Sequence, residues 1–478
     1  MKRKKGSIRA SQRGNEAKGK DGGVNSNACC PYFANLPSHL TAHILLKLPI
    51  KSLLICGCVC KNWKSMISEP HFGKSHFERA PISLMIRSGD GNRVSRTLYL
   101  LECEPERFEI ESNNHVKLEP IFKFPLRDAK SIREKRDEIE NKSKRPLRAV
   151  RLALEKNNEK VMGGKERVYI ACNPDHDRFE VVNSCNGFLC LSDPSNSIPL
   201  VICNPVTGEF IRLPKATTTP VRLNTGRVTM LGCSGFGFQS KTNEYKVIKI
   251  WVRHVKRAVH WEFERVILEI HTLGTLSWRN VEVDLQLSIS RLECPTCVND
   301  TLHWIIYDLG KRSLLCFSFE SERLQSFPSP PHVFENHNHF YDAEHIGMGE
   351  LKGFLYISDA CSFHDVTLWV MNEYGIGESW TKVYSIDTSA SPFSNPNSRP
   401  YGLCCWPVKH FEEGAAILLY HSRNCFIYYE PEKYVSKVFQ IHGTRSEEIE
   451  VIPHIPSLIS LKDIVKGDNI EVLNIHSR

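Results

Sequence analysis

The sequence of 478 residues lacks long apolar runs, and this absence bears on where the chain resides. A helix that crosses a membrane needs about 20 consecutive apolar residues, and a secretory signal needs an apolar region behind its basic start. Neither pattern occurs in the sequence. We therefore expect no membrane partner and no secretion, and we expect the protein in the cytoplasm, the nucleus or both.

Cysteine is abundant, with 18 residues, but the chain has little of the spacing that binds metal. Cys294 and Cys297 form the one Cys-x-x-Cys pair, and no second pair accompanies it. Structural zinc sites need four ligands, and a chain of this length in a reducing compartment does not depend on disulfides. We expect reduced, mostly buried cysteines. Metal or redox use of the Cys294–Cys297 pair stays as the less favoured alternative to a buried pair at the start of a strand.

Charge of one sign is concentrated at the start of the chain. The net charge is +8, and the first twenty residues are rich in Lys and Arg but almost free of large apolar side chains. We expect a disordered basic tail over residues 1–30, in which Lys2–Lys5 forms either a nuclear import signal or a solvated run. A charged segment at 127–167 lacks the aromatic residues of a nucleic-acid site. We read it as a mobile insertion and expect no nucleic-acid partner.

Complete catalytic motifs are missing as well. The glycines of Gly235-Phe236-Gly237-Phe238 are not followed by the Lys-Ser or Lys-Thr of a phosphate loop. A strand in which glycine relieves steric crowding is therefore the favoured interpretation. Four histidines fall in one Pro-flanked stretch without regular ligand spacing, which indicates an exposed loop rather than a metal site: His332, His337, His339 and His345. We expect no cofactor and no enzymatic activity.

Short helical signals are present between Phe33 and Phe72. A first helix is expected after Pro37, with Ser38 as its cap and Pro49 as its stop. A second is expected over about 51–56, where Gly57 permits a break, and a third over about 60–68, ended by Pro70. Three helices this short cannot cover all their large apolar side chains, and an apolar surface left on such a unit indicates a partner site.

The spacing of these residues resembles an F-box. The pattern that carries the resemblance is Leu36-Pro37, Ile44-Leu45, Leu48-Pro49, Leu53-Leu54, Val59-Cys60-Lys61-Asn62-Trp63 and Ile67-Ser68-Glu69-Pro70-His71-Phe72. The resemblance implies binding of a Skp-type adaptor and, through it, of cullin and RING subunits. The implied adaptor contacts are Leu36, Pro37, Ile44, Leu45, Leu48, Pro49, Leu53, Leu54, Val59 and Trp63. The chain departs from the family by having Ser38, His39 and His43 where acidic residues are usual.

The remainder of the chain shows strand signals that repeat. Alternating apolar residues begin near Pro81. Later units of two apolar strands, a polar turn and a more polar strand recur every 50 to 60 residues or so, which is typical of β-propeller blades. The turns expected between the third and fourth strands of each blade are 204–208, 320–322, 372–377 and 430–432.

This β region resembles the plant F-box-associated interaction domain. The motifs are Ser184-Cys185-Asn186-Gly187, Asn204-Pro205-Val206-Thr207-Gly208-Glu209, Gly235-Phe236-Gly237-Phe238 and Leu273–Trp278. We therefore expect an α+β multidomain chain with a small three-helix F-box and an all-β, propeller-like domain. The expected parts are the tail at 1–30, the F-box at 31–75, the start of the β domain at 81–126, the insertion at 127–167, the associated domain at 168–445 and a C-terminal tail at 446–478.

Two functions follow from this organisation. The resemblance implies a non-catalytic substrate receptor of an SCF-type ubiquitin ligase, in which the β domain captures a protein substrate that the sequence does not identify. The alternative is a propeller that binds a ligand, or acts as an enzyme, outside a ubiquitin ligase.

Overall fold

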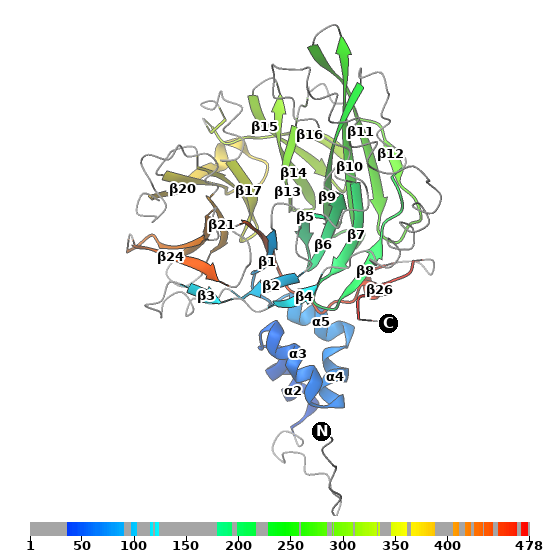
Figure 1. Ribbon diagram of the computed structural model, residues 1–478, viewed down its shortest axis with the longest axis vertical. Coiled ribbons are helices and arrows are strands. Elements are labelled where there is room, and N and C mark those ends of the chain that lie inside the picture. The colour runs from blue at the N-terminus through cyan, green and yellow to red at the C-terminus, as the bar shows by residue number, and fades with distance from the viewer. Residues whose placement is uncertain are drawn as a thin grey trace, which may run out of the picture. The chain divides into compact units, whose positions relative to one another are not determined.

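Figure 1 shows the computed structural model of the protein, in which four helices precede a ring of β-sheets. The structure describes residues 36–89, 97–102, 115–117, 120–123, 179–193, 198–216, 228–257, 260–283, 289, 291–308, 311–331, 333–334, 346–360, 365–387, 405–410, 416–421, 425–433, 435–442, 448–465 and 470–476. The chain divides into two units between Lys47 and Leu48. The expected tail at 1–30, the insertion at 127–167 and the four-histidine stretch lie outside the described residues.

The helices are α2 (Ser38–Leu45), α3 (Ile50–Val59), α4 (Lys61–Ile67) and α5 (Pro70–Phe77). The expected starts and stops were partly wrong. Ser38 is the first helical residue and makes no cap, because Pro37 occupies the N-cap position. Helix α3 runs through Gly57 without a break. The third helix ends before Pro70 as expected. A fourth helix, α5, was not expected; it begins at Pro70, since proline suits the first helical position, where no N–H bond is needed.

Six sheets form most of the rest of the described chain, and each corresponds to one blade of a propeller. The first blade contains β25 (Glu448–His454), β1 (Ser83–Gly89), β2 (Thr97–Leu101) and β4 (Pro120–Lys123). The second contains β5 (Glu180–Cys185), β6 (Phe188–Asp193), β7 (Ile198–Asn204), β8 (Glu209–Arg212) and β26 (Leu473–Asn474). The third contains β9 (Val228–Gln239), β10 (Glu244–Arg257), β11 (His260–Thr272) and β12 (Arg279–Val281).

The other three blades follow in chain order. The fourth contains β13 (Arg291–Val298), β14 (Thr301–Asp308), β15 (Lys311–Ser318) and β16 (Arg323–Phe327). The fifth contains β17 (Ile346–Leu351), β18 (Phe354–Asp359), β19 (Asp365–Met371) and β20 (Trp380–Asp387). The sixth contains β21 (Cys405–His410), β22 (Ile417–His421), β23 (Cys425–Glu430), β24 (Val435–His442) and β3 (His115–Lys117). All four expected turns connect the third and fourth strands of their blades.

The two ends of the propeller sequence meet in the first blade. Strand β25 pairs antiparallel with β1 from Ser83↔His454 to Gly89↔Glu448, so a C-terminal strand completes the N-terminal blade. Strand β3 pairs in parallel with β24 and joins the edge of the sixth blade. The expected C-terminal tail at 446–478 is therefore corrected. Residues 448–454 form an inner strand of the propeller, because the first blade would otherwise lack one.

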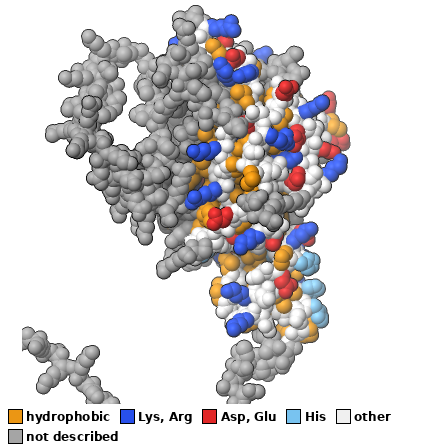
Figure 2. Space-filling view, turned by 90° about the vertical axis from the view of Figure 1, so that its right-hand side faces the viewer, with side chains coloured by type: hydrophobic (Ala, Val, Ile, Leu, Met, Phe, Trp, Pro, Cys, Tyr) orange, Lys and Arg blue, Asp and Glu red, His pale blue; other side chains and the backbone are white. Residues whose placement is uncertain are grey.

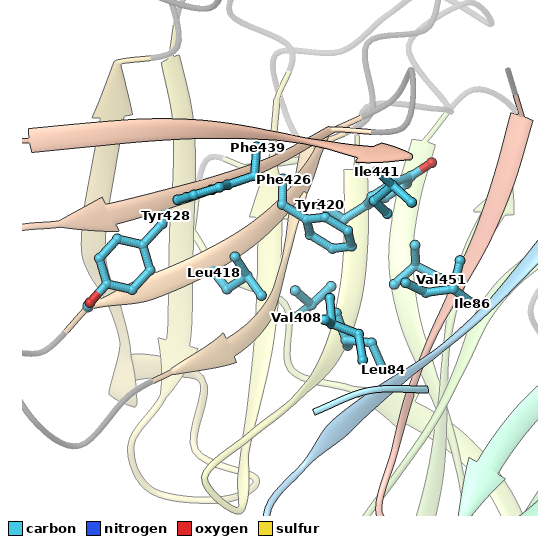
Figure 3. Packing of buried hydrophobic residues seen from close by; sticks show 12 residues of the cluster. Leu84, Ile86, Val408, Leu418, Tyr420, Phe426, Tyr428, Phe439, Ile441 and Val451 are labelled. Carbon is cyan, nitrogen blue, oxygen red and sulfur yellow. The ribbon is translucent and has the colours of Figure 1, made fainter. Parts of the chain in front are cut away.

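Apolar side chains pack between neighbouring blades. Successive residues of a strand point to opposite faces, so each blade supplies one face to the blade before it and one to the blade after it. Figure 3 shows this packing where the sixth blade meets the first, with Val408 beside Leu84 and with Leu418, Phe426 and Phe439 in the same cluster. Burial of each such side chain contributes roughly 1.5–3 kcal/mol. This cluster closes the ring together with the β25–β1 pairing.

Within the described residues, no helix has the length and apolar character needed to cross a membrane.

Candidate functional site

Helix α2 presents an apolar pair to solvent. Leu40 and Ile44 lie one turn apart, and 43% and 47% of their side-chain surfaces are exposed. The first turn of α2 contains no acidic residue. Pro37, at the N-cap, is also exposed, whereas Leu36 is half-buried. The exposed pair gives α2 an apolar face that is not covered within the described residues.

Helix α3 presents a similar pair. Ile55 and Val59 are 68% and 63% exposed and again lie one turn apart. Pro49, which caps α3, is exposed, and Leu48 and Trp63 are half-buried. Figure 2 shows hydrophobic side chains at the surface of the helical part, among Lys, Arg and His side chains. Such surfaces on short helices are typical of protein–protein contacts.

Two of the expected adaptor contacts are corrected by their burial. Leu45 is 1% exposed and Leu53 is 0% exposed, so their side chains lie inside the fold and cannot touch a partner. Leu54 is partly buried and packs against the apolar cluster between the first two blades. For Leu36, Pro37, Ile44, Leu48, Pro49, Val59 and Trp63, adaptor contact stays a prediction.

Leu40 and Ile55 are the exposed apolar residues that the motif comparison left out. The signal that points to them is the i, i+4 spacing from Leu40 to Ile44 and from Ile55 to Val59, which places each pair on one helix face. Of these two pairs, the F-box pattern includes Ile44 and Val59 but not Leu40 and Ile55. The pattern records family positions and does not record which residues share a helix face in this chain.

Helices α3 and α5 are fixed against other parts of their unit. Ile50 of α3 is buried in a cluster with Met85, Leu189 and Ile452 of the propeller. His76 of α5 is buried, and its Nε2 lies 3.1 Å from the carbonyl oxygen of Leu48. Burial lowers the pKa of His76, so the neutral ring donates this bond. These contacts hold α3 on the propeller and hold α5 against the residues that lead into α3.

The inner strands of the blades surround a cavity of about 500 Å³. Residues of β25, β5, β13, β17 and β21 line it, and most of their side chains are apolar. Three carboxylates also line it, those of Glu293, Glu350 and Glu450, and no Lys or Arg is among the lining residues that the structure describes. A cavity with this lining suits an apolar group or a cation.

Two of these carboxylates are neutralised by arginines. Arg87 of β1 is buried, and its Nε donates to Glu450 at 2.7 Å, while its Nη1 donates to the carbonyl of Phe179 at 2.8 Å. Arg291 forms an ion pair with Glu293. Glu293 also accepts a hydrogen bond of 3.0 Å from the Tyr307 hydroxyl. Glu350 accepts from the backbone N–H of Gly353.

A second cavity, of about 310 Å³, lies where β5, β13 and β25 end. Cys185, Cys297 and His454 are among its lining residues. The Cys185 thiol donates a hydrogen bond to Cys297, which raises the pKa of Cys185 and lowers that of Cys297. The Ser184 hydroxyl lies 2.9 Å from Nδ1 of His454. Burial lowers the pKa of His454 to about 3, so the ring is neutral at pH 7.

The remaining candidate motifs lie in strands. Cys294 and Cys297 lie within β13, and no group of three or more His, Cys, Asp or Glu in the described part of the chain is arranged to hold a metal. The Gly235–Phe238 motif lies in β9, as expected for a strand. A Cβ on Gly237 would lie 2.3 Å from the Phe319 ring of the next blade. Glycine is therefore needed there for close packing between blades.

Comparison with known families agrees with this architecture. Residues 33–75 match the F-box domain, and residues 147–465 match the F-box associated beta propeller domain. The second match covers well over half of the chain and ends within the segment that follows β25.

Curated relatives share the same organisation over most of their lengths. The F-box protein At3g07870 of Arabidopsis thaliana is 25% identical over 440 residues, which cover 86% of this chain and 88% of the relative. The F-box/kelch-repeat protein At3g23880 of the same plant is 21% identical over 406 residues, covering 84% and 92%. The F-box protein CPR1, also of this plant, is 23% identical over 390 residues, covering 77% of both chains. The chain therefore belongs to the plant F-box proteins that carry an F-box-associated β-propeller domain.

Proposed function

We propose that the protein is the substrate-recognition subunit of an SCF-type E3 ubiquitin ligase. Its F-box docks a Skp-type adaptor, which links it to cullin and RING subunits, and its propeller holds a protein substrate for ubiquitination. The chain supplies proximity and orientation and does not itself catalyse ubiquitin transfer.

The observation that carries this proposal is the apolar surface of the F-box helices. Leu40 and Ile44 on α2, and Ile55 and Val59 on α3, are each exposed by more than 40% in a chain whose other large apolar residues are mostly inside the blades. Covering such side chains stabilises a complex, and a few central anchors carry most of the energy of an interface. Contact with an apolar adaptor surface would cover the exposed pair on each helix.

The cavity lined by the inner strands supports a second candidate, a ligand-binding protein that acts outside a ubiquitin ligase. Its cavity of about 500 Å³ is within the size range of small-molecule sites, and its lining is apolar with a few carboxylates. The α2 helix also lacks the acidic residues usual in the family. These two observations would fit a chain that has kept its propeller site while losing adaptor affinity.

Protein turnover in plant cells distinguishes the two candidates. The full chain would be compared with an Ile44→Asp, Val59→Asp variant, because two buried charges should abolish adaptor docking while the propeller stays intact. Proteins that copurify with both forms, and that accumulate when the variant replaces the full chain, are the substrates that the proposal predicts.

The control is Trp261→Asp, which changes an exposed apolar residue of β11 far from the helices in the sequence. If no copurifying protein changes in abundance with the F-box variant, the receptor role is wrong. In that case the ligand-binding alternative is supported.

A further inference from the structure

We propose that two turns of the second blade clamp the C-terminal segment Ile455–Leu461 and that this segment fixes the F-box helices α3 and α5 in place on the propeller. The turns are Ser184–Gly187, between β5 and β6, and Asn204–Glu209, between β7 and β8. Their side chains are positioning residues, not a ligand site. The importance of this orientation for ubiquitin transfer rests on the proposed function, but the clamp itself does not.

Asn204 makes the central contacts of the clamp. It is fully buried, and its Nδ2 donates to the carbonyl oxygens of Ser457 at 2.9 Å and Ile459 at 2.8 Å. Its Oδ1 accepts from the backbone N–H of Val206 at 2.9 Å and so holds its own turn. One side chain thus shapes the turn and ties two carbonyls of the C-terminal segment to it. Leaving these buried groups without partners would cost about 1–3 kcal/mol each.

Glu209 makes a second set of contacts at the other end of the same turn. Its Oε1 accepts from the Ser460 hydroxyl at 2.9 Å, and its Oε2 accepts from the backbone N–H of Leu461 at 2.8 Å. Leu461 begins the short helix α9 (Leu461–Ile464) and is fully buried. The first N–H groups of a helix have no acceptor within the helix, and a carboxylate forms strong, charge-assisted hydrogen bonds with them. The segment is therefore held at both of its halves.

The first turn allows the segment to approach closely. Gly187 has a φ of +80°, and a Cβ at this position would lie 2.2 Å from Cβ of Ser457 and 3.2 Å from the carbonyl oxygen of Ile455. A glycine is thus required both by the backbone conformation and by the space that Ser457 occupies. This explains why the Ser-Cys-Asn-Gly motif ends in glycine.

The clamped segment reaches the F-box helices on its other side. Gly73 of α5 is buried, and a Cβ there would lie 3.3 Å from the carbonyl carbon of Leu458. The Leu458 side chain packs in the same apolar cluster as Ile50 and Leu54 of α3. The segment therefore has the second blade on one side and two F-box helices on the other.

The propeller is closed by one stretch of the chain, and the F-box helices are held by the next stretch. Strand β25, which closes the ring, ends at His454, immediately before the segment begins. Loss of the clamp should therefore loosen α5 without opening the blades, whereas Ile50 still holds α3 on the propeller. Residues that merely stabilised the propeller would loosen blades and helices together.

Hydrogen exchange of the full chain tests the clamp. Asn204→Asp keeps the Oδ1 acceptor for Val206 but replaces the Nδ2 donor with an oxygen facing two carbonyls. Gly73→Ala attacks the same contact from the helix side. The matched controls are Asn183→Asp, which removes the donor to the carbonyl of Phe236 within the propeller, and Gly57→Ala, whose Cβ would meet nothing within 4 Å.

We expect both test variants to speed exchange of the α5 amides and of Ile459 and Leu461 by about tenfold or more, while β13–β19 exchange as before. Lysine-reactive cross-links from Lys61, Lys64 and Lys74 to the propeller should spread to new partners. Neither control should change α5. Unchanged α5 exchange in both test variants, or faster exchange in all blades together, would overturn the proposal. A chain that fails to bind adaptor would contradict the proposed function and leave this result untouched.

Discussion

At the scale of single residues, buried neutral histidines are a feature of this propeller. His303 is fully buried, its Nδ1 donates to the carbonyl oxygen of Thr296 at 3.3 Å, and its Nε2 therefore accepts from the Tyr374 hydroxyl at 2.9 Å. A proton added to Nε2 would remove that acceptor. Burial lowers the pKa of His303 to about 4, and burial lowers the pKa of His454 to about 3.

The free energy of unfolding should therefore fall as the solution becomes acidic. Between pH 6.5 and pH 4 the unfolded chain binds protons at these histidines and the folded chain does not, so stability is fully present above pH 6.5 and is lost as the pH falls. We expect a loss of about 2 kcal/mol for each of the two histidines between pH 7 and pH 5. Urea unfolding at these pH values measures it.

His303→Phe is the variant that isolates one of these two contributions. The apolar ring of phenylalanine can pack against the neighbouring Phe327 and Tyr374 rings. The variant should lose about 2 kcal/mol less unfolding free energy than the unmodified chain between pH 7 and pH 5, because one of the two histidines is gone. Equal stability of the unmodified chain at pH 7 and pH 5 would show that these rings are not held neutral by burial.

Glycines between blades give a second prediction at this scale. Gly237→Ala forces the Phe319 ring to move, because the new Cβ would lie 2.3 Å from it. Overpacking of this kind typically costs about 1–3 kcal/mol. Gly57→Ala is the control in open space and should be neutral or slightly stabilising, as alanine favours helices. Thermal unfolding measures both, and an equal effect of the two changes would contradict the packing argument.

At the scale of elements, local repeats could be predicted from the sequence, but pairing between strands that are distant along the chain could not. The turns at 204–208 and 372–377 were placed correctly between third and fourth strands, because turn residues and strand patterns are local signals. The first strands of the β domain were predicted, but their completion into a blade was not, since β1 pairs with β25 more than 350 positions away along the chain. Helix α5 was missed because Pro70 was read as a stop, although proline also begins helices.

The same limit to local signals explains which residues of the candidate site could be predicted. The apolar residues of the F-box could be found by motif, but the burial of Leu45 and Leu53 depends on packing that no short pattern records. The clamp on Ile455–Leu461 joins residues about 250 positions apart, as in the Asn204–Ser457 bond, and no local signal indicates such a contact.

Truncation tests the closure of the ring. A chain ending at residue 447 lacks β25, which leaves β1 unpaired on one edge and exposes the cluster around Leu84 and Ile86. We expect it to lose cooperative thermal unfolding. A chain ending at residue 465 keeps β25 and α9 and should still unfold in one cooperative transition. Calorimetry of both chains makes the comparison, and cooperative unfolding of the shorter chain would show that β25 is dispensable.

At the scale of the whole molecule, the protein combines F-box helices with a closed propeller. The F-box contributes exposed apolar residues on α2 and α3, while α3 and α5 are anchored to the propeller through Ile50 and the C-terminal segment. A receptor that presents a substrate to a distant enzyme benefits from such anchoring, because a fixed orientation raises the effective concentration of the reacting groups.

Titration calorimetry of the full chain with a purified Skp-type adaptor tests this account most directly. We expect Ile44→Ala and Val59→Ala each to weaken adaptor binding by about 2 kcal/mol, roughly 30-fold, because each removes a central apolar anchor. Trp261→Ala, an equally exposed apolar residue of the propeller, should bind the adaptor like the unmodified chain. If Ile44→Ala and Val59→Ala bind as tightly as the Trp261→Ala control, the exposed faces of α2 and α3 are not the adaptor site and the account is contradicted.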